Sequence, residues 1–450
     1  MQSSDPYLIT VESIRQPPTS WKGRFNFLGP GFILSASIVG SGELIATTVL
    51  GAKAGYAALW IILVSCLAKV ALQLEFGRHA ILTGETSVQT LNKLPGYKIG
   101  KASWAVWFLF ILQSLKVVQI GGIVGGAAVV LSMMFPGVPV YFWAFAIAGV
   151  AGVLIFNGQY SLVEKASLFM IALFTALTIA SLISLQYTPF AFSLSDVIGG
   201  FRLNLSREEI AIAIGAFGIT GVASDEILAY NYWCLEKGYA SYTGPPDRST
   251  AWKQRAQGWI NVMYLDAVIA MVLYTAVTTI FYLLGAAILH GNEVVPNGNG
   301  VIETLALIYT QALGTGARTM YLIGAFFVLF SSVYATLAYW TRVYSDLFGY
   351  LGWINFWDLK TRKKTTSVLA FTIPFIWACL YLYIELPVLM VLSGGIIGSV
   401  MLLLVVYAGW HLKYRRTQSI KTGVFYTIIF WISVISIVLV AIYGLAQVIK

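Results

Sequence analysis

Two acidic stretches in different halves of the chain are nearly identical. Residues 41–46 read SGELIA and residues 224–229 read SDEILA, and the same spacing aligns residues 55–57 with residues 238–240, which both read GYA. Each stretch places a carboxylate beside small residues inside a long apolar segment. A repeated acid at a weak point of a membrane helix is typical of a cation site built between two related halves of one protein.

The acids of these stretches allow two interpretations. In the simpler one, Ser41 or Ser224 ends a loop, and Glu43 or Glu226 only compensates the positive end of the next half-helix. In the other, the acids line a polar pathway, because an ionised carboxylate at membrane depth is costly without a partner. We favour the second: two carboxylates and freed carbonyl oxygens suit a hard divalent cation such as Mg²⁺, Mn²⁺ or Ca²⁺. Asp225 is either a third ligand or a residue of the aqueous vestibule.

Carboxylates that share such a site also predict a pH effect. Two or three of them a few ångströms apart cannot all stay ionised without a cation, because like charges and burial oppose ionisation. We expect them to titrate as a coupled group with at least one proton in the empty site. A divalent ion then displaces protons when it binds, so its apparent affinity falls as pH drops.

The elements that must position these acids are helices with weak points. Residues 40–42 (GSG) precede Glu43, and residues 215–221 contain three glycines before the second motif. Glycine and serine destabilise a helix interior, so we expect both helices to be discontinuous. At such breaks, unwound carbonyls coordinate cations and the following half-helix attracts anions.

The composition is that of a polytopic membrane protein. Of 450 residues, 58% are hydrophobic and 10% are charged, whereas soluble domains average roughly 25% charged residues. The formal charge of +9 does not indicate nucleic acid, because the basic residues collect in particular loops. No nucleophile–base arrangement indicates an enzyme, and the three cysteines are too far apart to suggest a disulfide framework or a zinc motif.

Hydropathy predicts an all-α fold of eleven spans, numbered here in chain order. They cover residues 27–50, 57–82, 104–135, 140–157, 162–185, 208–236, 260–289, 318–347, 366–384, 387–412 and 422–447. Residues 301–313 are too short and polar to span, and we expect them to lie in the interface or to cap the bundle. Residues 1–22 are predicted to be a loosely ordered cytoplasmic tail.

The distribution of Lys and Arg sets the orientation. Alternate loops are basic: Arg15, Lys22 and Arg24; Lys93, Lys98 and Lys101; Lys237, Arg248, Lys253 and Arg255; Lys360, Arg362, Lys363 and Lys364; Lys413, Arg415, Arg416 and Lys421. Because cytoplasmic loops are the basic ones, the N-terminus is predicted inside the cell membrane and the C-terminus outside. The two acidic motifs then run in opposite directions. Residues 23–185 and 208–412 therefore form two inverted five-helix repeats, with residues 413–450 adding a loop and span 11.

Other polar residues in apolar segments remain open. Three histidines lie near span ends and are predicted to be interface residues: His79, His290 and His411. Lys69 and Lys116 either snorkel to an interface or pair with an acid such as Glu75. Residues 331–332 (SS) supply hydroxyls either to a second ion site or to close helix packing.

These residues resemble the Nramp family of divalent metal transporters, whose fold is that of the amino-acid symporter LeuT. The resemblance is clearest in residues 29–32 (GPGF), continues through residues 51–56 (GAKAGY) and Leu59-Trp60, and extends to spans 6, 8 and 10 at residues 218–220 (GIT), 331–332 (SS) and 392–393 (LS). It implies a 5+5 inverted repeat with broken helices 1 and 6, plus one extra helix.

The chain departs from the family at the metal site. Residues 40–43 (GSGE) replace the family's Asp-Pro-Gly-Asn, residues 222–224 (VAS) replace its Met-Pro-His, and Gly394 replaces a glutamine. A carboxylate reappears at Glu43, about one helical turn later. The missing methionine removes a soft ligand, and the missing histidine argues against proton symport. The pattern is similar in kind to that of Nramp-related magnesium transporters.

We therefore expect a secondary transporter that moves a divalent cation, a hard ion such as Mg²⁺ or Mn²⁺, by alternating access. The metal is substrate, and no cofactor, enzymatic activity or nucleic-acid partner is expected; the lipid bilayer is the other partner, and the sequence sets no oligomeric state beyond being compatible with a monomer. The predicted metal site consists of Glu43, Glu226, Asp225, Gly40, Ser41, Val222 and Ser224. The alternative is an ion-coupled symporter of a small organic solute such as an amino acid or amine.

Overall fold

The structure is a computed structural model that describes residues 5–200, 205–247, 249–290, 304, 315–417 and 420–449. In this part of the chain nearly every element is a helix, and nine helical segments are long and apolar enough to cross a membrane. A further apolar helix, α9 (Val140–Ile155), is shorter, and the first span is divided among three helical pieces. The all-α class is confirmed, whereas the count of eleven spans stays a prediction. The predicted interfacial segment 301–313 lies outside the described residues, apart from residue 304.

The long helical segments follow the predicted spans closely. In chain order they are α2 (Pro30–Ile38), η2 (Val39–Thr47) and α3 (Thr48–Ala54); α4 (Leu59–Ala68) and α5 (Val70–Thr83); α7 (Trp104–Leu115) and α8 (Val117–Met134); α9; α10 (Tyr160–Leu185); α12 (Arg207–Ile219) and α13 (Ser224–Lys237); α15 (Thr250–Ile288); α17 (Thr315–Leu351); α18 (Leu359–Ile384); α19 (Pro387–His411); and α20 (Val424–Ile449). Shorter elements are η1 (Val11–Ser13), α1 (Trp21–Phe25), α6 (Ser87–Asn92), β1 (Lys98–Ile99), β2 (Ala102–Ser103), α11 (Leu194–Gly199), α14 (Tyr239–Thr243) and η4 (Leu412–Arg416).

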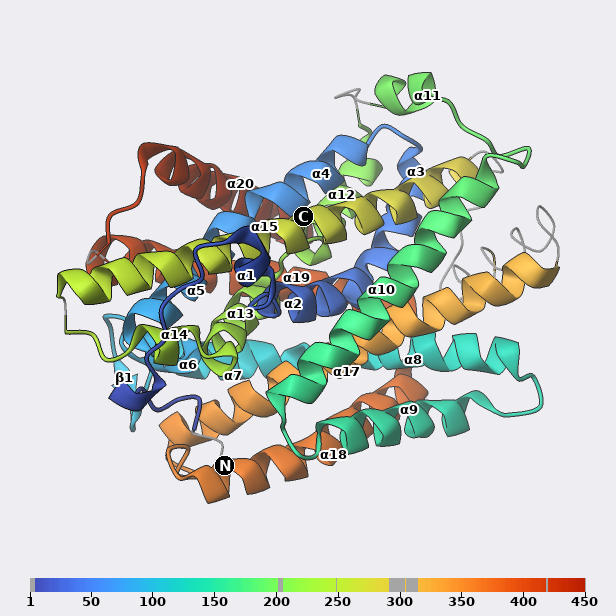
Figure 1. Cartoon of the computed structure of the whole chain (residues 1–450). Coiled ribbons are helices and arrows are strands. Elements are labelled where there is room, and N and C mark those ends of the chain that lie inside the picture. The colour runs from blue at the N-terminus through green and yellow to red at the C-terminus, as the bar shows by residue number, and fades with distance from the viewer. Residues whose placement is uncertain are drawn as a thin grey trace.

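The helices pack in two groups. The inner group consists of spans 1, 2, 6 and 7 (α2, η2, α3, α4, α5, α12, α13 and α15), and the outer group consists of spans 3, 4, 8 and 9 (α7, α8, α9, α17 and α18). Figure 1 shows α8, α9 and α18 together, on the side of the molecule away from α3, α4 and α15. The long helix α10 packs on α2 and α17, α19 packs on α8 and α12, and α20 packs on α19. Each group contains pairs of spans that are five apart in the chain: 1 with 6 and 2 with 7 in the inner group, and 3 with 8 and 4 with 9 in the outer group. An inverted five-helix repeat requires this spacing.

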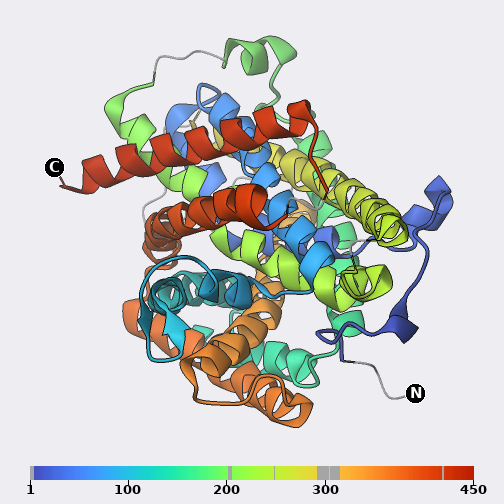
Figure 2. The ribbon, with the colours of Figure 1, turned by 90° about the vertical axis from the view of Figure 1, so that its left-hand side faces the viewer.

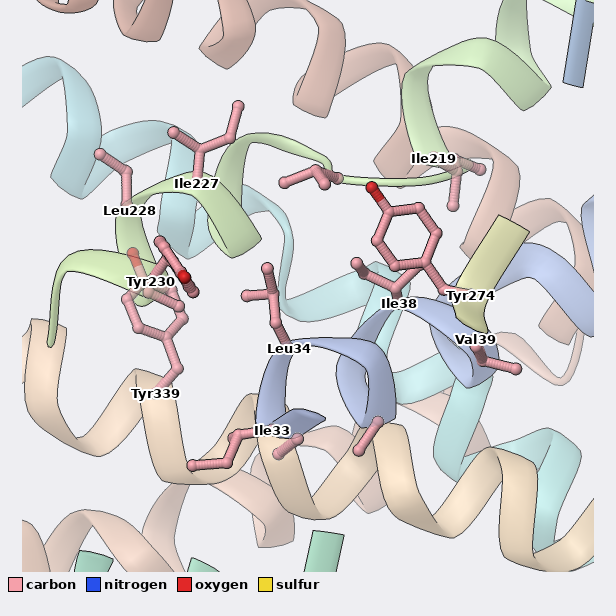
Figure 3. Close-up of a cluster of buried hydrophobic side chains, with 14 of the residues drawn as sticks. Ile33, Leu34, Ile38, Val39, Ile219, Ile227, Leu228, Tyr230, Tyr274 and Tyr339 are labelled. Atoms are coloured by element: carbon pink, nitrogen blue, oxygen red, sulfur yellow. The ribbon is translucent and has the colours of Figure 1, made fainter. Parts of the chain in front are cut away.

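Apolar side chains hold α2 against α13 at the centre of the molecule. Figure 3 shows Leu34 and Ile38 of α2 directed toward span 6, and Ile33 directed to the other side of α2. All three are buried. Helix α2, which leads into the first acidic motif, packs on α13, which carries the second. The relative position of the two motifs is therefore fixed by packing as well as by polar contacts.

The start of α2 is fixed by an aspartate that the sequence interpretation did not single out. Asp266 of α15 is buried and accepts hydrogen bonds from the backbone N–H groups of Gly29 (2.8 Å) and Gly31 (2.6 Å) and from the Tyr230 hydroxyl (3.0 Å). The first N–H groups of a helix have no partner within it, and α2 begins with Pro30, which supplies none. Asp266 thereby ties spans 1, 6 and 7 together.

Span 1 differs in form from the expected unwound break. The α-helix ends at Ile38 and continues as the π-helical segment η2 through the residues of the first acidic motif. The carbonyl oxygens at this change are satisfied from span 8: Ser331 and Ser332 donate to Ala36 O (3.1 and 3.0 Å), and Ser332 also donates to Ser37 O (2.6 Å). Because the serine hydroxyls of span 8 donate hydrogen bonds to these carbonyl oxygens, span 1 need not unwind at this point. The two serines thus serve helix packing, one of their two predicted roles.

Span 6 is interrupted as predicted. Helix α12 ends at Ile219 and α13 begins at Ser224. Gly221 adopts φ +63°, and a Cβ atom there would lie 2.8 Å from Cys66 Cα in span 2. Only glycine fits this left-handed position in close contact with a neighbouring backbone.

The N-terminal segment corrects the expectation of a loosely ordered tail. Asp5 forms an ion pair with Arg362 (2.6 Å), and the Tyr7 hydroxyl donates to Glu236 (2.6 Å), which Arg342 also contacts (2.6 Å). The segment therefore joins span 6 to spans 8 and 9. Figure 2 shows it running along the outside of the helices, far from the C-terminus. The segment is ordered by burial of Tyr7 and by the charged groups at Asp5 and Glu236. Composition alone did not reveal these contacts.

The predicted cytoplasmic loops gather at one end of the molecule. Glu85, which follows span 2, contacts Lys93 before span 3 (2.7 Å), Arg416 after span 10 (2.9 Å) and His79 (3.1 Å). Burial alone would raise the pKa of Glu85, but His79, Lys93 and Arg416 outweigh it and lower this pKa to about 2. The carboxylate therefore stays ionised at neutral pH and joins the loop between spans 2 and 3 to the loop after span 10. In Figure 1, β1 and α14 lie at this end and α11 lies at the opposite end.

The predicted orientation can be checked with two single cysteines in a Cys379→Ser background, which removes the exposed native cysteine. Lys363→Cys is exposed at the basic end, and Gly137→Cys lies in the open loop between α8 and α9 at the other end. We expect a membrane-impermeant maleimide to label position 137 in intact cells and position 363 only after permeabilisation. Labelling of position 363 without permeabilisation would reverse the orientation.

Candidate metal site at the break of span 6

Two buried lysines face the break of span 6, and each sits at a one-residue interruption of its own helix. Lys69 separates α4 from α5, and Lys116 separates α7 from α8. Both side chains are almost fully buried. A charged side chain in such a place must have partners within the protein. Neither lysine snorkels, and Glu75, the partner considered from the sequence, is instead paired with Arg78 (3.0 Å).

Lys116 pairs with Asp225 in the first turn of α13. The ammonium nitrogen lies 2.9 Å from Asp225 Oδ1, while Oδ2 accepts hydrogen bonds from Gln113 Nε2 (3.2 Å) and Trp340 Nε1 (3.3 Å). Spans 3 and 8 thus both reach the start of α13. The N-terminal turn of a helix favours negative charge, so Asp225 is held there by the helix, by Lys116 and by two N–H donors.

Glu226 lies beside this pair and is linked to span 1. Its Oε1 accepts a hydrogen bond from the Ser37 hydroxyl (2.8 Å), which lies 3.5 Å from the Thr336 hydroxyl of α17. Ser224 is not the cap that the simpler interpretation required, because Ala223 is the N-cap and makes no side-chain hydrogen bond. The Ser224 hydroxyl is buried and has no hydrogen-bond partner among the described residues.

A small cavity adjoins both acids. It lies between spans 3, 6, 8 and 10, and its lining consists of Lys116, Gln119, Ile120, Gly218, Ile219, Ala223, Asp225, Glu226, Thr336, Gly394 and Gly398. The volume open to the centre of a water molecule is about 10 Å³, room for roughly one water. The lining contributes oxygen atoms from carboxylates, an amide and a hydroxyl, and contains no sulfur.

Gln119 occupies the space that a side chain from span 10 would need. A Cβ atom at Gly394 would lie 2.3 Å from both Cβ and Oε1 of Gln119. The Gln119 amide oxygen is buried and has no hydrogen-bond partner among the described residues. The glutamine that the resemblance placed on span 10 is therefore replaced in space by one from span 3. Sequence reasoning missed Gln119, although its position one turn after Lys116 was a usable signal.

Glu43 meets the break of span 6 from another side. It is fully buried; its Oε1 accepts a hydrogen bond from Gly221 N (2.7 Å), and its Oε2 accepts one from the Thr278 hydroxyl of α15. Glu43 lies within Coulombic range of Glu226, but the cavity lining includes Asp225 and Glu226 and not Glu43. The structure thus brings the three predicted acids to one break and places only two at the cavity.

The remaining predicted site residues are backbone positions or apolar. Gly40 and Ser41 lie in η2, and Val222 lies buried in the break. A Cβ atom at Gly40 would lie 1.9 Å from Val328 O, so this glycine allows span 1 to touch the backbone of span 8. Among the described residues, no three His, Cys, Asp or Glu side chains form a group able to hold a metal ion. A cation at the cavity would therefore need neutral oxygens beside the acids, and Gln119 and Thr336 of the lining offer them.

Because Gln119 fills the space beside position 394, substitutions at these two positions should have strongly non-additive effects on stability. Gly394→Ala should force Gln119 out of place and lower stability by about 1–3 kcal/mol, because overpacking strains a close-packed interior. Adding Gln119→Ala to that variant should recover much of the loss. Thermal unfolding in detergent of the two single variants and the double variant gives the coupling energy. Additive losses would show that the two positions do not compete for one space.

Comparison with known proteins places this arrangement in a family. The sequence profile of the Nramp family, described as natural resistance-associated macrophage protein-like, matches residues 31–447. An uncharacterized protein of Pasteurella multocida is 26% identical over 344 residues, which cover 75% of this chain and 73% of that protein. The Dictyostelium discoideum metal transporter nramp1 homolog is 26% identical over 222 residues, which cover 48% of this chain and 40% of that transporter.

Solved structures agree on the fold. A mutant of the manganese transporter of Eremococcus coleocola superposes with a TM-score of 0.75 at 15% identity, covering 98% of this chain and 91% of that one. Mhp1, a nucleobase-cation-symport-1 family transporter, superposes with a TM-score of 0.62 at 12% identity, covering 94% and 92%. These likenesses confirm the predicted LeuT-like helical fold. Because the family profile covers nearly the whole chain, this protein belongs to the Nramp family.

Proposed function

We propose that this protein is a secondary transporter that moves a divalent metal cation across the membrane by alternating access. The observation that carries the proposal is a buried cavity beside Asp225 and Glu226, at the break of span 6, whose candidate metal ligands are all oxygen atoms, in a chain of the Nramp family. Several relatives bear the name metal transporter. The metal is the substrate, and the proposal needs no cofactor.

The chemistry of the cavity favours a hard ion such as Mg²⁺ or Mn²⁺. Carboxylate, amide and hydroxyl oxygens are the ligands that these ions prefer, whereas softer metals gain from sulfur and imidazole. Val222 and Ser224 stand where the resemblance places a methionine and a histidine. In the proposed site, Glu226 and Asp225 supply charge, and Gln119, Ser224 and Thr336 supply neutral oxygens.

Lys116 gives the empty site a counter-ion. Its ammonium nitrogen lies 2.9 Å from Asp225 Oδ1, so the positive charge of the lysine already balances the negative charge of this carboxylate without a metal ion. A divalent ion that approaches Glu226 and Asp225 repels this ammonium and competes with it for Asp225. Binding is then an exchange of one cation for another within the protein. In this scheme a proton need not cross the membrane with the metal, in keeping with the missing histidine.

The position of the cavity supports alternating access. Its lining joins span 6 of the inner group to spans 3 and 8 of the outer group. Movement of one group against the other would open the cavity to one side of the membrane at a time. In the present conformation the cavity is nearly closed, and the N-terminal segment bridges span 6 to spans 8 and 9 at the predicted cytoplasmic end.

A symporter of a small organic solute is the second candidate. The contact of Lys116 with Asp225 shows that this site accommodates an ammonium group, which an amine substrate would also carry. Two observations weigh against it: the cavity has room for about one water molecule, and both acids occupy the start of α13, where a substrate carboxylate would be repelled.

The transport proposal predicts that Glu226→Gln lowers uptake of Mg²⁺ or Mn²⁺ into proteoliposomes at least about tenfold. The substitution removes a negative charge that compensates the ion for the water molecules it loses on entering the site. Glu12→Gln, which alters an exposed acid of the N-terminal segment, is the matched control and should leave uptake unchanged. Equal metal uptake by both variants would contradict the proposal. Uptake of amino acids or amines in place of metals, with the same sensitivity to Glu226→Gln, would favour the second candidate.

Selectivity gives an independent test at Val222. Val222→Met adds a thioether at the break and should raise the ratio of Cd²⁺ to Mg²⁺ affinity roughly tenfold, because soft metals gain from sulfur. Val222→Leu adds bulk without sulfur and is the control. Isothermal calorimetry of the purified variants measures both affinities. A wild-type protein that strongly rejects Mg²⁺ and Ca²⁺ would contradict the preference for hard ions.

A further inference from the structure

The break of span 6 contains a second polar site, away from the cavity. The Lys69 ammonium nitrogen lies 2.7 Å from Phe217 O and 2.5 Å from Thr220 O, the carbonyl oxygens at the end of α12. The Ser65 hydroxyl lies 3.2 and 3.1 Å from the same two oxygens. We propose that these oxygens form a binding site for a monovalent cation, and that Lys69 permanently occupies it with its own ammonium group.

The local backbone explains why a cation belongs there. The last carbonyl groups of a helix have no partner within it and carry the negative end of the helix dipole. The left-handed turn at Gly221 then takes the chain away before these carbonyls can bond to a following turn. Two strong acceptors are therefore left in a place without exposure to solvent, where an unsatisfied carbonyl is costly.

The occupant is bound as a cation and not merely buried. Lys69 has no exposed surface, and the ring of Phe217 lies 4.8 Å from its ammonium nitrogen. Its two hydrogen-bond acceptors are backbone carbonyls, whereas Lys116 contacts a carboxylate. Glu43, which accepts a hydrogen bond from Gly221 at the same break, is a carboxyl group near this site. Carbonyl oxygens around a compact positive charge, with a carboxylate nearby, are the environment that proteins offer to Na⁺ and K⁺.

This site is separate from the proposed metal site. Lys69, Ser65, Phe217 and Thr220 are absent from the lining of the cavity, which meets span 6 at Gly218, Ile219, Ala223, Asp225 and Glu226. The two sites therefore contact the same break through different residues. It follows that the folded chain needs no dissociable Na⁺ or K⁺ at the end of α12, whichever solute it transports.

The test compares two substitutions of one lysine. Lys69→Ala removes the ammonium and its stem, which leaves room for a small cation, whereas Lys69→Met removes the charge but fills the space of the stem. Purified proteins are heated in detergent with EDTA at constant ionic strength, in Na⁺, K⁺, n-propylammonium or the bulky N-methylglucamine cation. Because EDTA removes divalent metals, the result does not depend on the proposed transport function.

We expect the melting temperature of Lys69→Ala to rise saturably with Na⁺, K⁺ or n-propylammonium, as mass action requires for a ligand of the folded state. Wild type and Lys69→Met should respond to none of these cations relative to N-methylglucamine. An equal response of Lys69→Ala and Lys69→Met, or no response of either, would overturn the proposal.

Wild type supplies a second measurement if Lys69→Ala does not fold. Replacement of all Na⁺ and K⁺ by N-methylglucamine should leave the melting temperature of wild type unchanged. A wild-type protein that requires Na⁺ or K⁺ for stability would show that the ammonium does not serve as the cation.

Discussion

Every backbone polar group inside a membrane protein needs a partner within the protein, because lipid offers none. The interruption between α12 and α13 concentrates this requirement at four residues of span 6. Glu43 of span 1 accepts the hydrogen bond of Gly221 N, and Lys69 and Ser65 of span 2 satisfy the carbonyls of Phe217 and Thr220. The inner group is thus assembled around one break.

The charges near the break follow from the same constraint. Three acids, Glu43, Asp225 and Glu226, lie with two lysines, Lys69 and Lys116, in a region with almost no access to water. Each lysine compensates part of a negative group that could not remain buried alone. Glu226 accepts a hydrogen bond from the Ser37 hydroxyl and, unlike Asp225, forms no ion pair among the described residues. It is therefore the carboxylate best suited to attract a cation from outside.

The fold and the convergence of three acids on the break of span 6 followed from the sequence, whereas the partners of these acids did not. Hydropathy and the repeated motif located the spans and brought three acids to the break of span 6, because these features are local in sequence. The Lys116–Asp225 pair, the Lys69 contacts and the use of Gln119 in place of a residue at position 394 join different spans. No periodicity within one helix encodes which face of span 3 meets span 10. The packed N-terminal segment was missed for a similar reason: its order comes from Arg362 and Glu236, far along the chain.

Small residues set how closely the helices around the cavity meet, and so limit the size of the cavity. A Cβ atom at Gly40 would lie 1.9 Å from a carbonyl of α17, one at Gly218 would lie 2.6 Å from a carbonyl of α19, and one at Gly394 would strike Gln119. Apolar attraction between helices is weak in lipid, so such close backbone contacts and the hydroxyl bonds beside them provide much of the cohesion. These contacts lie on spans 1, 6 and 10, around the proposed metal site. The Gly40 contact joins the inner group to the outer group, so movement of one group against the other must break it. A side chain added at Gly40 would therefore change the balance between closed and open conformations, whereas one added at Gly218 or Gly394 would change how span 10 packs beside the site.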